Sequence, residues 1–169
     1  PPALPPATFD VRCAPGIQPK FERAVAMLHS FWFDAATTAF NDIIKSDSTC
    51  ALGYWGRPIT LLGNPMTRVG PNAQRLQEGL ALSQKAVALA AKQSHREQMY
   101  AATAQAYYEG DAMSTHATGM QAHEAAWDRL RKAHTEDMEA TIFYARTLVA
   151  NASPTDLTFA QQIQAAEML

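Results

Sequence analysis

Residues 24–47 read AVAMLHSFWFDAATTAFNDIIKSD, and this stretch decides the fold. Small residues alternate in it with large apolar ones, and it ends on an acidic residue; the positions are Ala24, Phe33, Ala36, Phe40, Ile43 and Asp47. A small residue on one helix lets the next helix approach closely, and aromatic side chains fill the wedge between the two. The stretch therefore predicts two antiparallel helices, one over about 17–31 and one over about 33–46, joined by a tight turn.

The rest of the chain repeats the helical spacing of apolar residues, with turn and capping residues between the segments. These breaks predict six further helices, over residues 50–62, about 76–92, 94–110, 115–134, 137–151 and 155–169. Pro58 lies inside the first of these six, where it should bend or break the helix. Because no segment alternates as a half-buried strand does, we predict an all-α protein of about eight helices. Neighbouring helix pairs should stack as a short α-solenoid, since one pair cannot bury its apolar stripe alone.

Composition and charge exclude several classes of protein. The chain has 169 residues, of which 47% are apolar and 18% charged, as in ordinary globular domains. We divide it into an extended Pro-rich arm, residues 1–16, and one helical repeat domain, residues 17–169. The formal charge of -2 argues against nucleic-acid binding, and no apolar run reaches the roughly 18 residues of a membrane span. Cys13 and Cys50 match no zinc or redox spacing, which leaves a disulfide and two buried free thiols as alternatives.

The segment over residues 24–47 resembles a tetratricopeptide repeat. Ala24 and Ala36 stand in the small positions of that repeat, Phe40 stands in its large position, and Ser48 replaces the proline that usually ends it. Three segments are more specifically similar to a family of exported bacterial tetratricopeptide-repeat proteins of poorly defined function. They are CAPGIQPKFERAVAMLHSFWFDAATTAF over 13–40, CALGYWG over 50–56 and ATIFYARTLVANA over 140–152.

This resemblance implies a right-handed solenoid in a protein that is exported to the periplasm or the extracellular space. It also favours a Cys13–Cys50 disulfide, and the repeat register agrees, because Cys13 precedes the first helix and Cys50 opens the third. Tetratricopeptide repeats hold a peptide or a partner protein on a concave face, so we expect a non-catalytic scaffold or protein-binding module. Where the family tends to have His-Pro-Leu-Trp, this chain has Asn64-Pro65-Met66-Thr67, which puts a binding role of that loop in doubt.

Aromatic residues are dense over residues 31–55, where a single helix pair cannot easily bury all of them: Phe31, Trp32, Phe33, Tyr54 and Trp55. We predict that Trp32, Tyr54 and Trp55 contact the partner. Trp32 stands at an inter-helix turn, and the alternative is that it folds onto the Pro-rich arm. Tyr54 is also placed to fill the wedge between repeats.

One group of side chains shares a helix face with steps of three, four and three residues: Met113, His116, Met120 and His123. Thioether and imidazole groups together suit copper, especially Cu(I). The favoured interpretation is a buried stripe, because Trp127 and Leu130 continue the same face, so we assign no metal and no cofactor. His29 precedes Ser30 without an acidic residue at the spacing of a catalytic triad, and no phosphate-binding loop or HExxH motif occurs. We therefore predict that the chain is not an enzyme.

The last predicted helix has an apolar pattern through residues 165–169 and no polar capping helix after it. Terminal repeats of a solenoid need a polar outer face. Either the protein continues beyond residue 169, or a second copy covers this end in a head-to-tail contact. Self-assembly through such contacts is our alternative to the protein-binding scaffold.

Overall fold

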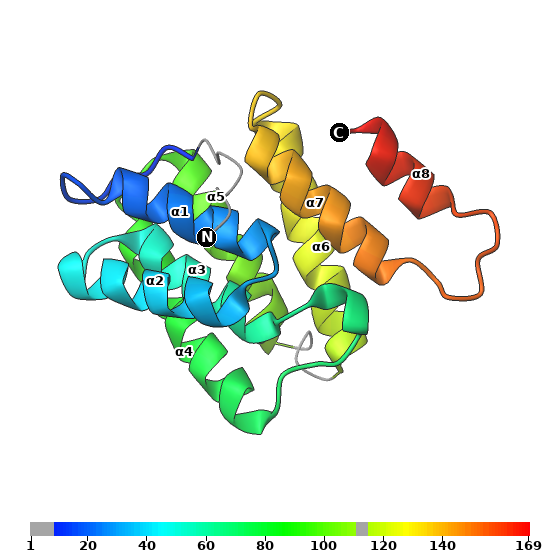
Figure 1. The fold of residues 1–169 in the computed structure, drawn as a ribbon, viewed down its shortest axis with the longest axis horizontal. Coiled ribbons are helices and arrows are strands. Elements are labelled where there is room, and N and C mark those ends of the chain that lie inside the picture. Colours follow the sequence, from blue (N-terminus) through cyan, green and yellow to red (C-terminus); the bar gives the residue numbers. More distant parts are fainter. Residues whose placement is uncertain (1–8, 111–114) are drawn as a thin grey trace.

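The computed structural model describes residues 9–110 and 115–169, and within these ranges it contains helices and no strand. The order along the chain is α1 (Gln18–His29), α2 (Phe33–Ser46), α3 (Ala51–Leu62), a 3-10 turn η1 (Pro65–Thr67), α4 (Ala73–Ala90), α5 (His95–Tyr108), α6 (His116–Ala133), α7 (Met138–Asn151) and α8 (Ala160–Glu167) (Figure 1). The predicted all-α class and the predicted eight helices are confirmed.

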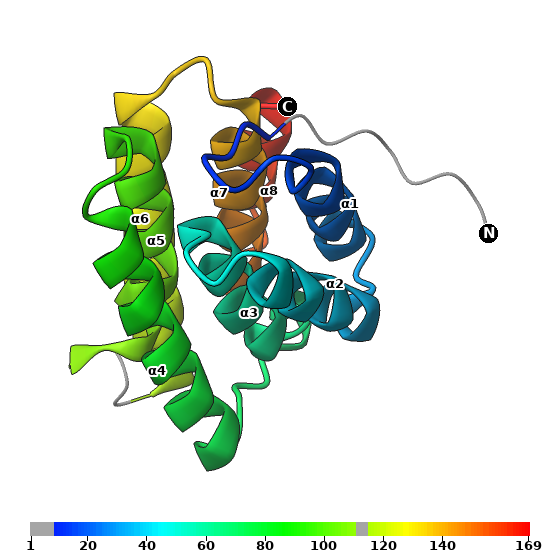
Figure 2. The same cartoon turned by 90° about the vertical axis from the view of Figure 1, so that its left-hand side faces the viewer.

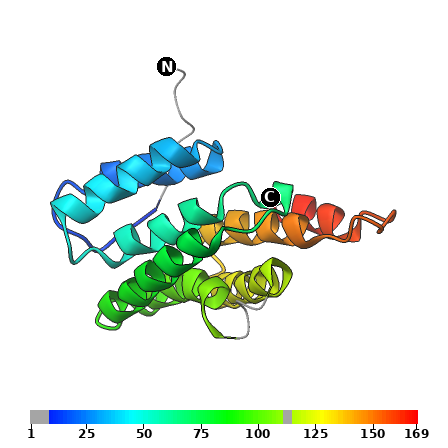
Figure 3. The same cartoon turned by 90° about the horizontal axis from the view of Figure 1, so that it is seen from below.

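Each helix packs against the next one along the chain, and α3 also packs against α5. Seen from below, α1 and α2 form one layer, α3 and α7 lie in the middle, and α5 and α6 form the opposite layer (Figure 3). Figure 2 shows α8 next to α7 on the side away from α5. The first and last helix pairs also meet, because His29 of α1 lies 2.7 Å from Glu139 of α7.

Close approach of helices depends on the small residues that the sequence places between them. Ala24 and Ala36 are fully buried, as the α1–α2 pairing predicts. Gly56 of α3 allows the closest contact, because a Cβ atom built there would lie 2.1 Å from the ring of Phe40 on α2. A glycine inside a helix lowers helix stability, so its use here reflects packing rather than propensity.

Trp55 of α3 is the centre of the aromatic core. Its ring contacts six other aromatic rings, each from a different part of the chain: Phe9, Phe21, Phe40, Tyr100, Trp127 and Phe143. Its indole N–H donates to Thr103 Oγ1 at 3.0 Å, which satisfies the one polar group of the side chain. The prediction that Trp55 contacts a partner is therefore wrong, since its side chain is 0% exposed.

Two expectations about the helices differ from the structure. Pro58 does not break α3, which continues to Leu62. The carbonyl oxygen of Pro58 accepts a hydrogen bond from the Tyr108 hydroxyl at 2.9 Å. The residues of α3 before and after Pro58 are largely buried, so tertiary packing holds both halves of the helix in place. The last helix begins at Ala160 rather than Thr155, because Asp156 Oδ1 accepts from the backbone and hydroxyl of Thr158 and forms a turn there.

The N-terminal segment contributes to the core, although we expected the folded domain to begin at residue 17. Phe9 is fully buried and lies against Phe21 and Tyr100, with ring centroids 4.9 Å and 4.7 Å away. The sequence offered no periodicity at this point, and residues 9–12 form no helix. The rest of the arm, residues 1–8, lies outside the described residues.

Candidate functional site

An apolar cavity of about 570 Å³ lies between the α1–α2 turn, η1, α7 and α8, and we call it the α7–α8 cavity. Its walls are mainly apolar, and the larger side chains that line it are Phe31, Met66, Ile142, Val149 and Leu169. Four polar side chains also reach it: His29, Glu139, Arg146 and Gln162. Binding sites for ligands are commonly concave and mostly apolar with a few placed polar groups, and this cavity has that character.

The elements around the α7–α8 cavity are positioned by local features of the sequence. Phe31 has a left-handed backbone, with φ of 59°, which ends α1 and leaves its side chain at the cavity. Asn64 caps η1 by accepting the backbone N–H of Met66 at 3.0 Å. The Arg68 guanidinium donates to the carbonyl oxygen of Ala152, and this bond ties η1 to the end of α7.

Helix α8 covers the cavity, although few of its own residues are buried. Ala165 is its one buried residue, and it packs in the same core as α7. Helix α8 lies next to α7 (Figure 1).

The polar side chains of the α7–α8 cavity are unequally paired. His29 Nε2 lies 2.7 Å from Glu139 Oε2, and both side chains are mostly buried. The guanidinium of Arg146 stacks over the ring of Phe143, with Cζ 4.7 Å from the ring centroid. Its Nε and Nη1 atoms, together with Gln162 Oε1, are buried and have no hydrogen-bond partner among the described residues. Such groups usually find partners in native proteins, so a polar ligand group or an ordered water that enters the cavity has these three atoms to bind.

The other predicted partner-binding residues have mixed positions. Trp32 is 41% exposed, which agrees with a surface role, and it directly follows Phe31 of the cavity wall. Tyr54 is half-buried and packs against the core, which agrees with the alternative prediction that it fills the wedge between repeats. Of the three predicted residues, Trp32 alone stays available for a partner.

On the described part of the face proposed for copper, His123 has both ring nitrogens in hydrogen bonds. His123 is 1% exposed, its Nδ1 lies 2.6 Å from the carbonyl oxygen of Thr103, and its Nε2 accepts the indole N–H of Trp127 at 3.0 Å. Because a carbonyl can only accept, Nδ1 carries the proton and neither nitrogen has a free lone pair. His116 Nδ1 lies 2.6 Å from the Tyr107 hydroxyl, Met120 is buried, and Met113 lies outside the described residues.

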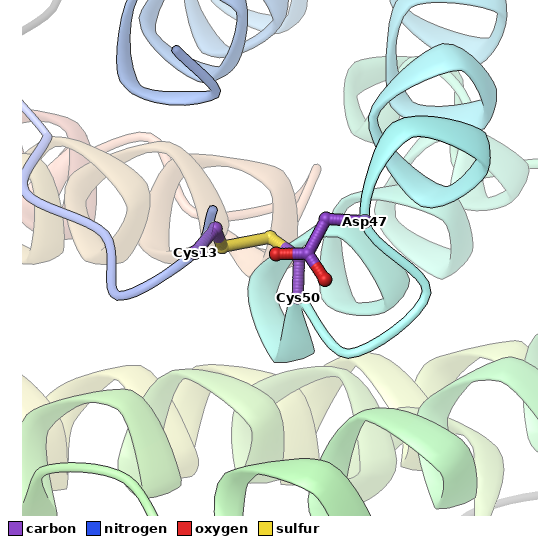
Figure 4. Close-up of side chains that lie close together, drawn as sticks. All are labelled: Cys13, Asp47 and Cys50. Atoms are coloured by element: carbon purple, nitrogen blue, oxygen red, sulfur yellow. A yellow bond between two sulfur atoms is a disulfide. The ribbon is translucent and has the colours of Figure 1, made fainter. Parts of the chain in front are cut away.

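Cys13 and Cys50 form a disulfide with their Cα atoms 4.9 Å apart, which confirms the expected pairing. Figure 4 shows Asp47 beside the two sulfur atoms, and the three ligand-type groups lie within 4.8 Å of one another. The sulfur atoms are bonded to each other, so they offer no thiolate to a metal. Asp47 instead accepts from Thr49 and from the backbone N–H of Ala14, and these bonds lower the pKa of its carboxyl group.

A second cavity, of about 690 Å³, lies between the N-terminal segment and the turn from α6 to α7. Arg96 and Glu97 line it and bind neighbouring groups, although Glu97 Oε2 is buried without a hydrogen-bond partner among the described residues. Arg96 donates to Asp137 Oδ2 at 2.6 Å and to the carbonyl oxygen of Asp10 at 2.9 Å. Glu97 Oε1 accepts the backbone N–H of Arg12 at 2.7 Å, and burial raises the pKa of Glu97. These contacts hold the N-terminal segment on α5, so we treat this cavity as structural.

Sequence reasoning did not identify Arg146, Glu139 or Gln162 as site residues. One signal was present, since Arg146 is the single charged residue between Ala140 and Ala152. A lone charge in an otherwise uncharged apolar segment needs a partner, but periodicity cannot say where that partner comes from.

Comparisons of the chain with protein-family models, with curated proteins and with solved structures find no match in any of the three. The resemblance to tetratricopeptide-repeat proteins therefore stays a prediction, whereas the helical fold is observed. Across residues 9–110 and 115–169, none of the helices combines the length and hydropathy that crossing a bilayer demands.

Proposed function

We propose that this chain is a non-catalytic protein-binding module of an exported tetratricopeptide-repeat protein, and that its partner inserts an apolar segment into the α7–α8 cavity. The observation that carries the proposal is the cavity itself, which is large, apolar and open at the surface. The buried disulfide is in keeping with an oxidising, exported setting.

The rim of the cavity supports this function further. Phe31, Met66 and Leu169 line the cavity and are each at least two-fifths exposed. Large apolar side chains gathered around a concave surface mark interaction sites in soluble proteins. Trp32 adjoins this rim in sequence and supplies an aromatic anchor of the kind that dominates binding energies.

The proposal is tested by closing the cavity without disturbing the core. Ala166 of α8 lines the cavity and is exposed, so Ala166→Trp places a large side chain in the opening. Ala160→Trp makes the same change at an exposed position of α8 that does not line the cavity. Peptides selected from a displayed library on the wild-type chain should bind Ala166→Trp at least about tenfold more weakly and Ala160→Trp unchanged.

Isothermal titration calorimetry measures both affinities, and a cross-linker at Met66 locates the bound peptide. Failure to select any peptide would contradict the proposed function. Equal binding to both tryptophan variants would place the binding surface elsewhere and contradict the role of the cavity.

A second copy of the chain is the other candidate partner, because α8 and the loop before it carry exposed apolar side chains. Leu157, Phe159 and Ile163 are each more than half exposed. Burying them against a second copy would remove apolar surface from water. Multi-angle light scattering should then show concentration-dependent association that Ile163→Glu abolishes. A monomer at high concentration would count against self-assembly.

A further inference from the structure

The guanidinium of Arg146 is the least compensated polar group in the α7–α8 cavity. It is held against the Phe143 ring, at 4.7 Å from Cζ to the centroid, so its position is set by packing. Its Nε and Nη1 atoms are buried and donate no hydrogen bond within the described part of the chain. A buried charged donor without an acceptor is unfavourable, and a ligand acceptor that reaches it gains the energy of a charge-assisted bond.

The charge of Arg146 calls for an anionic acceptor. Burial lowers the pKa of Arg146 to about 10, and attraction to Glu139 partly opposes that shift, so the guanidinium stays charged at neutral pH. Glu139 attracts Arg146 electrostatically but accepts no hydrogen bond from its Nε or Nη1 atom, and Glu139 Oε2 is paired with His29 at 2.7 Å. The acceptor has to come from outside the described residues.

Gln162 of α8 limits the kinds of ligand that can satisfy the polar groups of the cavity. Its Oε1 lies in the same cavity and is buried without a donor. A ligand that satisfies both side chains brings an anionic acceptor for Arg146 and an N–H group for Gln162. An Asp or Glu residue within a peptide brings both, its side-chain carboxylate and a backbone N–H, whereas a fatty acid brings the carboxylate alone.

We infer that the partner segment carries an acidic side chain flanked by apolar residues, and that Arg146 binds its carboxylate while the apolar residues contact the walls. This inference rests on the proposed function, since it names the chemistry of the segment that enters the same cavity. Arg146 acts as the specificity-determining residue of the site.

Two displayed peptide libraries test the inference on the complete chain. Both libraries display short apolar peptides that are fused to the display protein through their C-terminal ends, so that no free terminal carboxylate is present. Every peptide of one library has Glu at its central position, and every peptide of the other has Gln there. The Glu library should enrich on the wild-type chain. For synthetic peptides with amidated ends, the Glu-to-Gln exchange should weaken binding at least about tenfold by fluorescence anisotropy. On Arg146→Met the two peptides should bind alike, and on Arg146→Lys the preference for Glu should be partly kept.

Arg131→Met is the matched control, because Arg131 also stacks on a ring, that of Tyr144, but is paired with Asp128 and does not line the cavity. Thermal unfolding checks that each variant folds, and the Glu–Gln comparison on the wild-type chain needs no variant. Equal binding of the two peptides to the wild-type chain overturns the inference and leaves the proposed function standing. Binding of neither peptide, with no peptide selected, overturns both. Decanoate that binds more tightly than the Glu peptide assigns the cavity to a lipid carboxylate and overturns the choice of a peptide.

Discussion

Lowering the pH should destabilise the protein through one buried histidine, His123. Desolvation lowers the pKa of this imidazole from 6.5 to about 4, and the nearby charge of Arg146 acts in the same direction. In the folded state Nδ1 donates to Thr103 and Nε2 accepts from Trp127, so an added proton would break the second bond. Between pH 6.5 and pH 4 the unfolded chain binds a proton that the folded chain does not.

The magnitude follows from the two pKa values. The stabilising contribution is fully present above pH 6.5, falls as the pH drops and is lost below about pH 4. At about 1.4 kcal/mol per pH unit, the loss in the free energy of unfolding amounts to about 3 kcal/mol. A loss of this size is a large fraction of the stability of a domain, which is typically about 5–15 kcal/mol.

Urea unfolding followed by circular dichroism measures this loss at several pH values. Carboxylates titrate in part of the same range; the pKa of Glu97 is raised and those of Asp47 and Asp128 are lowered. His123→Gln keeps these groups and removes the imidazole, so the difference between wild type and variant isolates the histidine. That difference should shrink by about 3 kcal/mol on going from pH 7.5 to pH 4. A difference that does not change with pH would refute the assignment of the lowered pKa to His123.

Two further changes test how the fold is held together. The Cys13–Cys50 disulfide closes a loop with a sequence separation of 37, so replacing both cysteines by alanine should lower the free energy of unfolding by about 4 kcal/mol. Urea unfolding measures it, and a loss below about 1 kcal/mol would show that the unfolded chain is not restrained by the bridge. Gly56→Ala puts a Cβ atom 2.1 Å from the Phe40 ring and should cost about 1–3 kcal/mol. Adding Phe40→Leu should recover part of this cost, whereas strictly additive losses would mean that the two residues are not in contact.

The local features of the helices could be predicted because their causes are local. The N-caps are examples, since Ser94 accepts the backbone N–H of Glu97 and Asp137 accepts that of Ala140. Even here tertiary structure changed one detail. A Ser followed three residues later by a Glu favours a capping box, in which the Glu97 carboxylate would turn back to the Ser94 backbone, but Glu97 Oε1 accepts from Arg12, 85 residues away. A local bond was replaced by one that only the folded chain brings within reach.

The candidate site could not be predicted in the same way. Trp55 and Trp32 are equivalent as sequence signals, yet six aromatic rings surround Trp55 while Trp32 stays partly exposed. Helical spacing made His123 a candidate copper ligand, but in the folded structure both of its ring nitrogens are engaged, one with Thr103 of α5 and the other with Trp127 of its own helix. Periodicity shows which face of a helix is covered and not which side chains cover it.

The sequence by itself determined that this protein is helical, roughly where its helices lie, and that small residues let α1 and α2 pack closely. These properties depend on contacts over one or two turns of helix and on caps a few residues away. Only the tertiary structure decided that α1 meets α7, that Phe9 enters the core, and that Arg146 faces a cavity without a partner. The reason is that these contacts join residues far apart in sequence, and their geometry depends on how successive helix pairs rotate against each other.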